Sequence, residues 1–150
     1  MSRRLPPYRD SLAGTLLAAR EAVMSPIRPY LREAGVTEQQ WRVLRVLADG
    51  GELDLSSLAE AALLHPPSVT RILKDLVDRR LIRRDSDQTD GRRSLVRLTD
   101  AGRALMDHTA AFTSRLVDRN RSAFGADRLA NLQRELKELT SALRKAHTSD

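Results

Sequence analysis

Hydrophobic residues recur at helical spacing between residues 66 and 79 and predict a short amphipathic helix there. Its apolar stripe comprises Val69, Ile72, Leu73, Leu76 and Val77. Prolines are tolerated in a first helical turn, whose amides lack intrahelical partners, so Pro66 and Pro67 mark the beginning of this helix. The outward-facing residues are Ser68, Thr70, Arg71 and Lys74. Such side chains suit phosphates and base edges of DNA, and the alternative interpretation is an ordinary solvated helix face.

A second helix is predicted directly before this one, from Leu55 to Leu64, with Asp54 or Ser57 as its N-cap. Two helices with a tight connection indicate a helix-turn-helix. Two strands are predicted next, at residues 81–84 and 94–98, separated by a polar loop at 85–93. The whole segment therefore has the pattern of a winged helix-turn-helix.

The polar loop of this wing is rich in arginine. We expect Arg92 and Arg93 at its tip, where a guanidinium can enter the minor groove of DNA. Asp90 is placed to orient Arg92 through a charge-assisted hydrogen bond. We favour DNA contact over a purely solubilising role for this arginine cluster.

Two helices are predicted before the helix-turn-helix. The first runs from Ser11 to Leu31 and ends at Gly35. Thr37 caps the second, with Gln40 completing a capping box, and residues 49–51 end it. Their apolar stripes are Leu12, Leu16, Val23, Ile27, Tyr30 and Leu31 in the first helix, and Trp41, Val43, Leu44, Val46 and Leu47 in the second.

Two further helices are predicted after the wing. Thr99 caps the first, which runs through Leu105, and residues 125–127 separate it from the last. The first has apolar residues at Leu105, Met106, Phe112, Leu116 and Val117, and the last has Leu129, Leu132, Leu136, Leu139 and Leu143. This three-four spacing is that of a coiled-coil seam. A core stripe is the alternative, but we favour a dimer.

Composition narrows the class of protein. A chain of 150 residues corresponds to about one domain, and a net charge of +6 with a pI near 10.6 favours polyanionic partners. The absence of cysteine excludes disulfides, thiolate metal sites and thiol-based sensing. We find neither an apolar run long enough for a membrane span nor a signal peptide, and therefore expect a cytoplasmic protein that does not associate with membranes.

Enzymatic function is not expected. His65, His108 and His147 show no metal-ligand spacing, and neither a glycine-rich phosphate loop nor a nucleophile–base arrangement is present. We therefore expect no catalytic residues, no metal and no cofactor. Binding of single-stranded RNA is also disfavoured, because the few aromatic residues are not interleaved with the basic ones.

The order of these elements resembles the MarR family of bacterial transcriptional regulators over nearly the whole chain. The most specific segments are 37–44, Leu58–Ala59, 68–73, 90–92 and 96–102. Within the family, residues 19–25, Arg28–Pro29 and the 37–41 run look like the branch that regulates homoprotocatechuate (hydroxyphenylacetate) catabolism. The chain departs from the family pattern at Arg80, where glycine is common, and at Thr89 and Gly91, where the wing is often more basic.

The resemblance implies a fold that is mostly α with a small β-hairpin wing. Residues 1–150 would form a single MarR-type domain, with a winged helix-turn-helix lobe at 37–99 and dimerisation helices at 9–34 and 100–147. A homodimer would bind a pseudo-palindromic operator in double-stranded DNA. By transfer, Ser68, Thr70, Arg71 and Lys74 face the major groove, Asp90 and Arg92 serve the wing, and Ser56 and Ser57 contact phosphates.

Members of the family commonly bind small aromatic acids between the dimerisation helices and the DNA-binding lobe, which disfavours the half-site spacing that DNA requires. In this chain Arg20, one turn before Met24, could meet a carboxylate, and Trp41 could stack on a ring. Ser11 and His65 could add hydrogen bonds. Each has an alternative: Arg20 snorkels or pairs with an acid across the dimer, Trp41 belongs to the core, and His65 caps a helix.

We therefore expect a repressor of an aromatic-compound catabolic operon that is released by a small aromatic acid of the hydroxyphenylacetate, homoprotocatechuate or hydroxycinnamate type. The alternative is a MarR-like DNA-binding regulator with a non-aromatic effector or with none. The sequence does not identify the operator, the effector or the sign of regulation, because a fold determines none of them.

Overall fold

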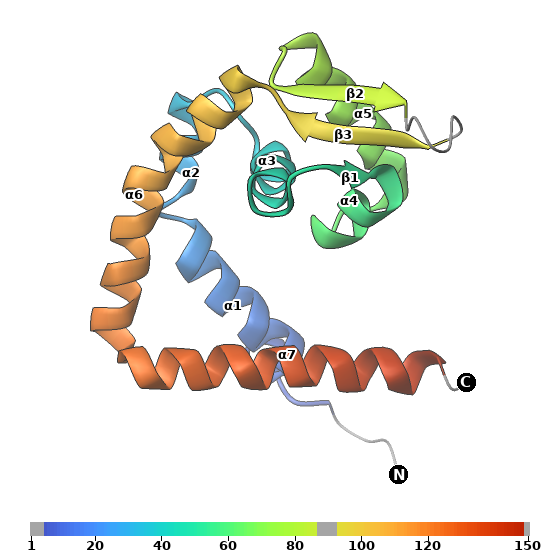
Figure 1. Ribbon diagram of the computed structural model, residues 1–150. Helices are drawn as coiled ribbons and strands as arrows, with labels where there is room; N and C mark the ends of the chain where they lie inside the picture. The colour runs from blue at the N-terminus through green and yellow to red at the C-terminus, as the bar shows by residue number, and fades with distance from the viewer. Residues whose placement is uncertain (1–4, 87–92, 149–150) are drawn as a thin grey trace. The chain divides into compact units, whose positions relative to one another are not determined.

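The computed structural model describes residues 5–86 and 93–148 (Figure 1). The elements are η1 (Tyr8–Asp10), α1 (Leu12–Met24), α2 (Arg28–Glu33), α3 (Glu38–Gly50), β1 (Leu53–Asp54), α4 (Leu55–Ala61), α5 (Pro66–Asp78), β2 (Ile82–Ser86), β3 (Ser94–Leu98), α6 (Asp100–Phe124) and α7 (Ala126–Thr148). The fold is mostly helical with a small antiparallel sheet, and the predicted winged helix-turn-helix is confirmed.

The prediction of one continuous helix from Ser11 to Leu31 is wrong, because α1 and α2 are separate helices. Pro26 and Pro29 lie at the break, and neither has an amide to donate to the carbonyl one turn earlier. Gly35 ends α2 as predicted, with a φ of +72°. The amide of Val36 bonds back to the Leu31 carbonyl at 3.0 Å, which closes the left-handed cap.

The apolar stripe predicted for these two helices is buried only at its end. Ile27 and Leu31 are in the core. The remaining members are exposed in the single chain: Leu12, Leu16, Val23 and Tyr30. The described residues of one chain therefore leave an apolar face of α1 open to solvent.

Helix α3 begins with the predicted capping box. The Gln40 amide donates to the Thr37 hydroxyl at 3.1 Å, and the Gln40 side chain accepts from the Thr37 amide at 3.0 Å. The predicted inward face is buried at Trp41, Val43, Leu44 and Leu47 and half-buried at Val46. Local capping and the apolar stripe thus place α3 in the core.

The sheet has the order β1-β3-β2, with both pairings antiparallel. In the hairpin, Ile82 pairs with Leu98 and Arg84 with Val96. Strand β1, which consists of two residues, was not predicted, because two residues are too few to show a periodic pattern. It aligns Leu53 with Val96 and thereby joins the beginning of α4 to the wing.

The helix-turn-helix consists of α4 and α5. Helix α4 ends three residues earlier than predicted, because Leu63 adopts a left-handed conformation with a φ of 53°. Arg42 of α3 donates from Nη1 to the Leu63 carbonyl at 3.3 Å and so ties the turn to α3. The predicted stripe of α5 is buried except at Val77, which is 38% exposed. The prediction that Val77 is buried is therefore wrong.

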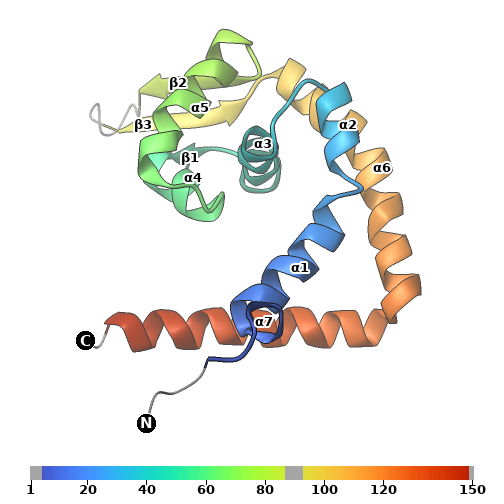
Figure 2. The same ribbon diagram turned by 180° about the vertical axis from the view of Figure 1, so that it is seen from behind.

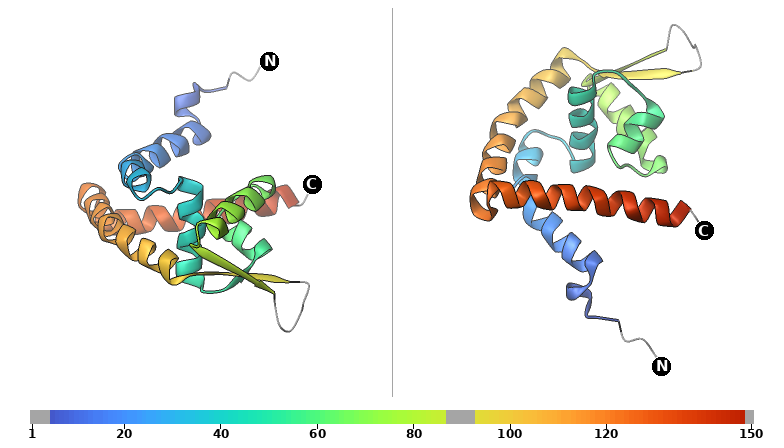
Figure 3. Two further views of the ribbon diagram at one scale, coloured as in Figure 1. Left: turned by 90° about the horizontal axis from the view of Figure 1, so that it is seen from above. Right: turned by 60° about the horizontal axis from the view of Figure 1, so that its bottom comes forward.

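The core of this lobe lies among α3, α4, α5 and the sheet. Its fully buried members include Leu44, Leu58, Leu76 and Val96, one from each of these elements. Figure 2 shows α5 lying across the strands of the hairpin. Viewed from above, the two strands extend together beyond α4 and α5 (Figure 3).

The last two helices follow the wing directly. Thr99 caps α6 as predicted, accepting from the Gly102 amide at 3.1 Å, and its hydroxyl donates to the Arg80 carbonyl at 2.6 Å. The chain divides into two compact units, residues 1–111 and 112–150, with the boundary inside α6. Gly125, with a φ of +97°, separates α6 from α7. No helix in the described part of the chain combines the length and apolarity that a membrane crossing needs.

Candidate functional site

The outward face of α5 carries the residues predicted to read DNA. Thr70, Arg71 and Lys74 are exposed, and Ser68 is half-buried. Lys74 forms an ion pair with Asp78 one turn later at 2.9 Å, which raises the pKa of Lys74. Within residues 5–86 and 93–148, Arg71 has no ion pair or hydrogen bond from its side chain. Arg71 is therefore free to contact a ligand.

A contact between two helices holds α5 in place. Gln40 of α3 donates from Nε2 to the Asp75 carboxylate at 2.6 Å, and Arg79 donates to Gln40 Oε1 at 3.4 Å. The glutamine that completes the capping box of α3 thus also anchors the C-terminal half of α5. The capped N-terminus of α3 therefore orients the face of α5 that is predicted to read DNA.

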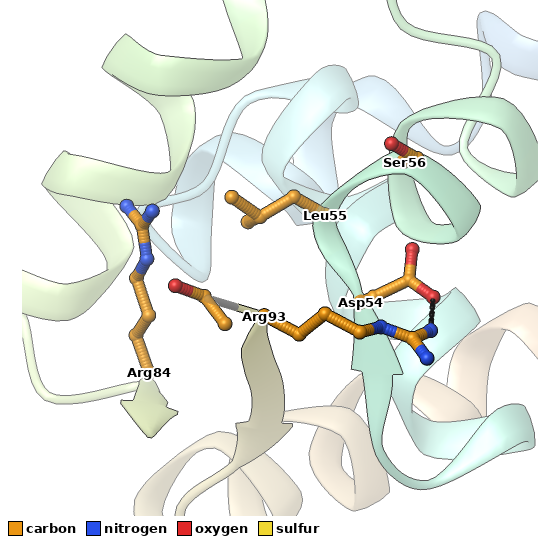
Figure 4. A pocket seen from close by; sticks show the side chains of 6 residues that line it. Asp54, Leu55, Ser56, Arg84 and Arg93 are labelled. Atoms are coloured by element: carbon orange, nitrogen blue, oxygen red, sulfur yellow. Dashed lines mark hydrogen bonds and ion pairs between the residues drawn. The ribbon is translucent and has the colours of Figure 1, made fainter. Parts of the chain in front are cut away.

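A polar hollow of about 440 Å³ lies between α4, β2 and β3 (Figure 4). Its lining residues are Asp54, Leu55, Ser56, Arg84, Arg93 and Ser94. Asp54 caps α4 through the Ser57 amide at 2.9 Å and pairs with Arg93 at 2.5 Å. The Ser57 amide, followed by the Arg93 guanidinium, lowers the pKa of Asp54. The hollow therefore holds one fixed anion and two guanidinium groups.

Sequence reasoning did not identify Arg84. The alternation of faces along β2 could have indicated its orientation. Ile82 is buried, and Arg84, two residues later, belongs to the same face of the strand. Arg84 also lines a second hollow, of about 310 Å³, together with Thr70 and Lys74 of α5. Arg84 is therefore a residue of the wing hairpin that faces the helix predicted to read DNA.

The remaining predicted DNA contacts have different surroundings. Asp90 and Arg92 lie outside the described residues. Arg93 directly precedes β3, and its contact with Asp54 joins the wing to the beginning of α4. Ser56 is exposed in the polar hollow, whereas the Ser57 hydroxyl donates to Asp54 at 3.2 Å.

Arg20 lies in a group of charged side chains that joins three helices. Its guanidinium hydrogen-bonds the carboxylate of Glu38, in the first turn of α3. Glu38 also pairs with Arg28 at 3.4 Å, and Arg28 forms a two-bonded pair with Glu21 at 2.7 and 2.8 Å. This pair raises the pKa of Arg28 and lowers that of Glu21. Arg20 thus pairs with an acid of its own chain, whereas the alternative predicted from the sequence was a pair across the dimer.

Trp41 is buried, at 8% exposure, and the Arg45 guanidinium lies 5.5 Å from its ring centroid. Its Nε1 is a buried donor without a hydrogen-bond partner in the part of the chain that the structure describes. The buried Nε of the adjacent Arg42 also has no hydrogen-bond partner among the described residues. Burial, followed by the charge of Arg20, lowers the pKa of Arg42. Cationic side chains thus gather on the α1–α3 side of the lobe.

Within the described part of the chain, the other candidate effector residues are not joined to this group by hydrogen bonds. The Ser11 hydroxyl caps α1 through the Gly14 amide at 3.0 Å and donates to the Tyr8 carbonyl at 2.6 Å. Met24 is half-buried. His65 is exposed at the N-cap of α5, and its side chain makes no capping bond. The structure thus joins Arg20 to α3, whereas among the described residues it joins neither Ser11 nor His65 to this charged group.

Comparison with known proteins agrees with this architecture. Residues 34–93 match the family model described as "MarR family". The chain is 36% identical over 124 residues to the HTH-type transcriptional regulator FarR of Neisseria gonorrhoeae, covering 83% of this chain and 85% of the relative. It is 35% identical over 129 residues to the homoprotocatechuate degradative operon repressor of Escherichia coli, covering 86% and 87% respectively.

A solved structure shows the same likeness. The crystal structure of NadR in complex with 4-hydroxyphenylacetate superposes with a TM-score of 0.81 and 34% sequence identity, covering 91% of this chain and 96% of that chain. The predicted resemblance to the homoprotocatechuate branch is confirmed by these relatives. From its winged helix-turn-helix and its similarity over most of its length, this chain belongs to the MarR family of transcriptional regulators.

Proposed function

We propose that this regulator is a homodimeric repressor of an aromatic-compound catabolic operon, binding a pseudo-palindromic operator and released by a small aromatic acid. The observation that carries the DNA-binding part is the α5 face, which presents Thr70, Arg71 and Lys74 beside an arginine-bearing hairpin. These side chains suit the major groove, where arginine pairs with guanine and lysine with guanine or phosphate. We propose no catalytic activity, and we propose that the protein acts in the cytoplasm.

The dimer is supported by apolar surface that one chain leaves exposed. No residue of α7 is buried, and its leucines, such as Leu132 at 43% and Leu143 at 45% exposure, follow seam spacing. The exposed face of α1 adds further apolar surface. We propose that helices in the 9–34 and 100–147 segments pair with a second copy, while the 37–99 lobe binds DNA. Two-fold symmetry then separates the half-sites by about one helical turn, roughly 34 Å.

An aromatic acid is proposed as effector on two grounds. One relative is named for the homoprotocatechuate degradative operon, and a structural neighbour was solved with 4-hydroxyphenylacetate. In this chain, Arg20 supplies a cation close to α3, where Trp41 has a buried indole donor. We propose Arg20 as the carboxylate contact, with Met24, Trp41, Ser11 and His65 as further candidates.

The test is binding to a DNA fragment from upstream of the regulator's own gene, at fixed salt. We expect tight binding that 4-hydroxyphenylacetate, homoprotocatechuate or a hydroxycinnamate such as ferulate releases. Arg71→Ala should weaken binding and relax sequence preference by about 1–3 kcal/mol at the base it reads. If the protein binds the DNA fragment tightly and none of the acids releases it, the proposal of DNA binding stands and the proposal of an aromatic effector is overturned. Unchanged binding by Arg71→Ala would overturn the assigned reading face.

A further inference from the structure

The polar hollow between α4, β2 and β3 is separate from the base-reading face of α5. Two guanidinium groups, Arg84 and Arg93, and one carboxylate, Asp54, line it. With Arg84 and Arg93 at +1 each and Asp54 at −1, the formal charge of these three groups is +1. The hydroxyls of Ser56 and Ser94 add hydrogen-bond donors. Such a lining suits a single anionic group.

The two arginines of the hollow have different surroundings. Arg93 is held by Asp54, which also caps α4, so this arginine is tied to the framework of the lobe. Arg84 has no side-chain hydrogen bond or ion pair among the residues that the structure describes. In Figure 4 the Arg84 side chain stands across the hollow from the Asp54–Arg93 pair. Among the described residues, Arg84 is therefore the cation of this hollow that is available to an incoming anion.

The position of Arg84 indicates which anion this is. Arg84 lines the polar hollow on one side and the hollow beside Thr70 and Lys74 on the other, so it lies where the wing hairpin faces α5. When α5 occupies a major groove and the wing a minor groove, the sugar–phosphate strand that separates the two grooves passes between them. Resting on the DNA binding proposed above, we propose that the polar hollow receives a backbone phosphate of the operator, neutralised by Arg84, while Asp54 positions Arg93 at its edge.

The first test compares two neighbouring arginines of β2. Arg84→Gln removes the proposed phosphate contact. Arg83→Gln is the matched control, because Arg83 lies on the opposite face of the strand and pairs with Asp85 at 3.3 Å. Loss of one phosphate contact per subunit should reduce the slope of log K against log salt by about 0.9, or about 1.8 for a dimer. Arg84→Lys should retain most of the slope, and Arg83→Gln all of it.

The second test identifies the phosphate directly. Operator fragments carry one neutral methylphosphonate at a time, and each is titrated with wild type and with Arg84→Gln. We expect one position in each half-site where neutralisation weakens wild-type binding and has no effect on the variant. Circular dichroism melting of both variants confirms that they are folded at the assay temperature.

The outcomes separate this inference from the proposed function. If wild type shows no salt-dependent binding to the fragment, the DNA-binding proposal fails as well. If wild type binds and Arg84→Gln keeps the wild-type slope, only the phosphate site is overturned. If Arg84→Gln changes which operator sequences are preferred while the slope is unchanged, Arg84 contacts a base and the phosphate assignment is wrong.

Discussion

Arg20 on α1 and Glu38 in the first turn of α3 are joined by a hydrogen-bonded ion pair. Arg28 shares the same carboxylate, so Glu38 holds two arginines from the N-terminal helices against the beginning of the DNA-binding lobe. An arginine that is proposed to bind an effector acid therefore already has a carboxylate partner. We therefore expect an acid that binds Arg20 to compete with Glu38 for it.

Glu38→Gln should accordingly strengthen effector binding. The Arg20 side chain is 46% exposed, so solvent screening limits the pair to about 1 kcal/mol or less. Removing the competitor should raise effector affinity by at most about fivefold. Isothermal titration with 4-hydroxyphenylacetate or homoprotocatechuate measures this change.

Glu33→Gln is the control for the lost charge, because Glu33 is exposed on α2 and has no ion pair in the described part of the chain. It should leave the affinity unchanged. Arg20→Gln should abolish the effector response. An unchanged or weaker affinity in Glu38→Gln would show that Glu38 does not compete for the effector site.

Asp54→Asn should change the pH dependence of stability. In the folded protein the Ser57 amide and Arg93 lower the pKa of Asp54 below its unfolded value, which is about 3.9. The carboxylate therefore stabilises the fold above that value, and the contribution is lost as pH falls through the folded pKa. Asparagine keeps the N-cap but loses the ion pair.

Thermal unfolding followed from neutral pH to about pH 2 tests this expectation. The variant should melt below wild type at neutral pH, and the difference should shrink on acidification. If the difference in melting temperature is constant across this pH range, protonation of the Asp54 carboxylate does not change the stability of the fold.

Gly102→Ala should destabilise the protein. A Cβ at Gly102 would lie well inside contact distance of the Leu81 carbonyl oxygen, because the first turn of α6 approaches the backbone before β2. Overpacking against backbone costs typically about 1–3 kcal/mol. Denaturant unfolding measures the loss.

Gly50→Ala is the comparison, because a Cβ there would meet the Leu53 side chain at an ordinary 3.5 Å. Alanine at this helical position should stabilise the protein, by at most about 1 kcal/mol. Equal stability of the two variants would contradict the close approach of α6 to Leu81.

Leu136→Glu should dissociate the proposed dimer. Leu136 is half-buried in the middle of the α7 seam, and a carboxylate there would have to be desolvated in the interface. Sedimentation should show a monomer where wild type is a dimer. Ser141→Glu adds the same charge on the opposite face of the seam and should remain dimeric. A dimeric Leu136→Glu would rule out this seam as the interface.

The sequence by itself determined the features that depend on neighbours within one turn. The Thr37–Gln40 capping box, the beginning of α5 at Pro66 and the cap at Thr99 were all predicted, because the interacting groups are three or four residues apart. The apolar stripes of α3 and α5 were predicted for the same reason, since burial follows the helical period. The exception is Val77, the last member of its stripe, which is 38% exposed.

Only the tertiary structure decided which distant groups meet. Asp54 and Arg93 are 39 residues apart, and Gln40 and Asp75 are 35 apart, so no local pattern identifies either pair. The same applies to Arg84. In the sequence nothing distinguishes it from the other arginines of the wing, and only the register of the hairpin places it beside α4 and α5. Helical and strand periods are short-range properties of the chain. Ion pairs and hollows depend instead on how the elements pack, because packing brings together groups that the sequence separates.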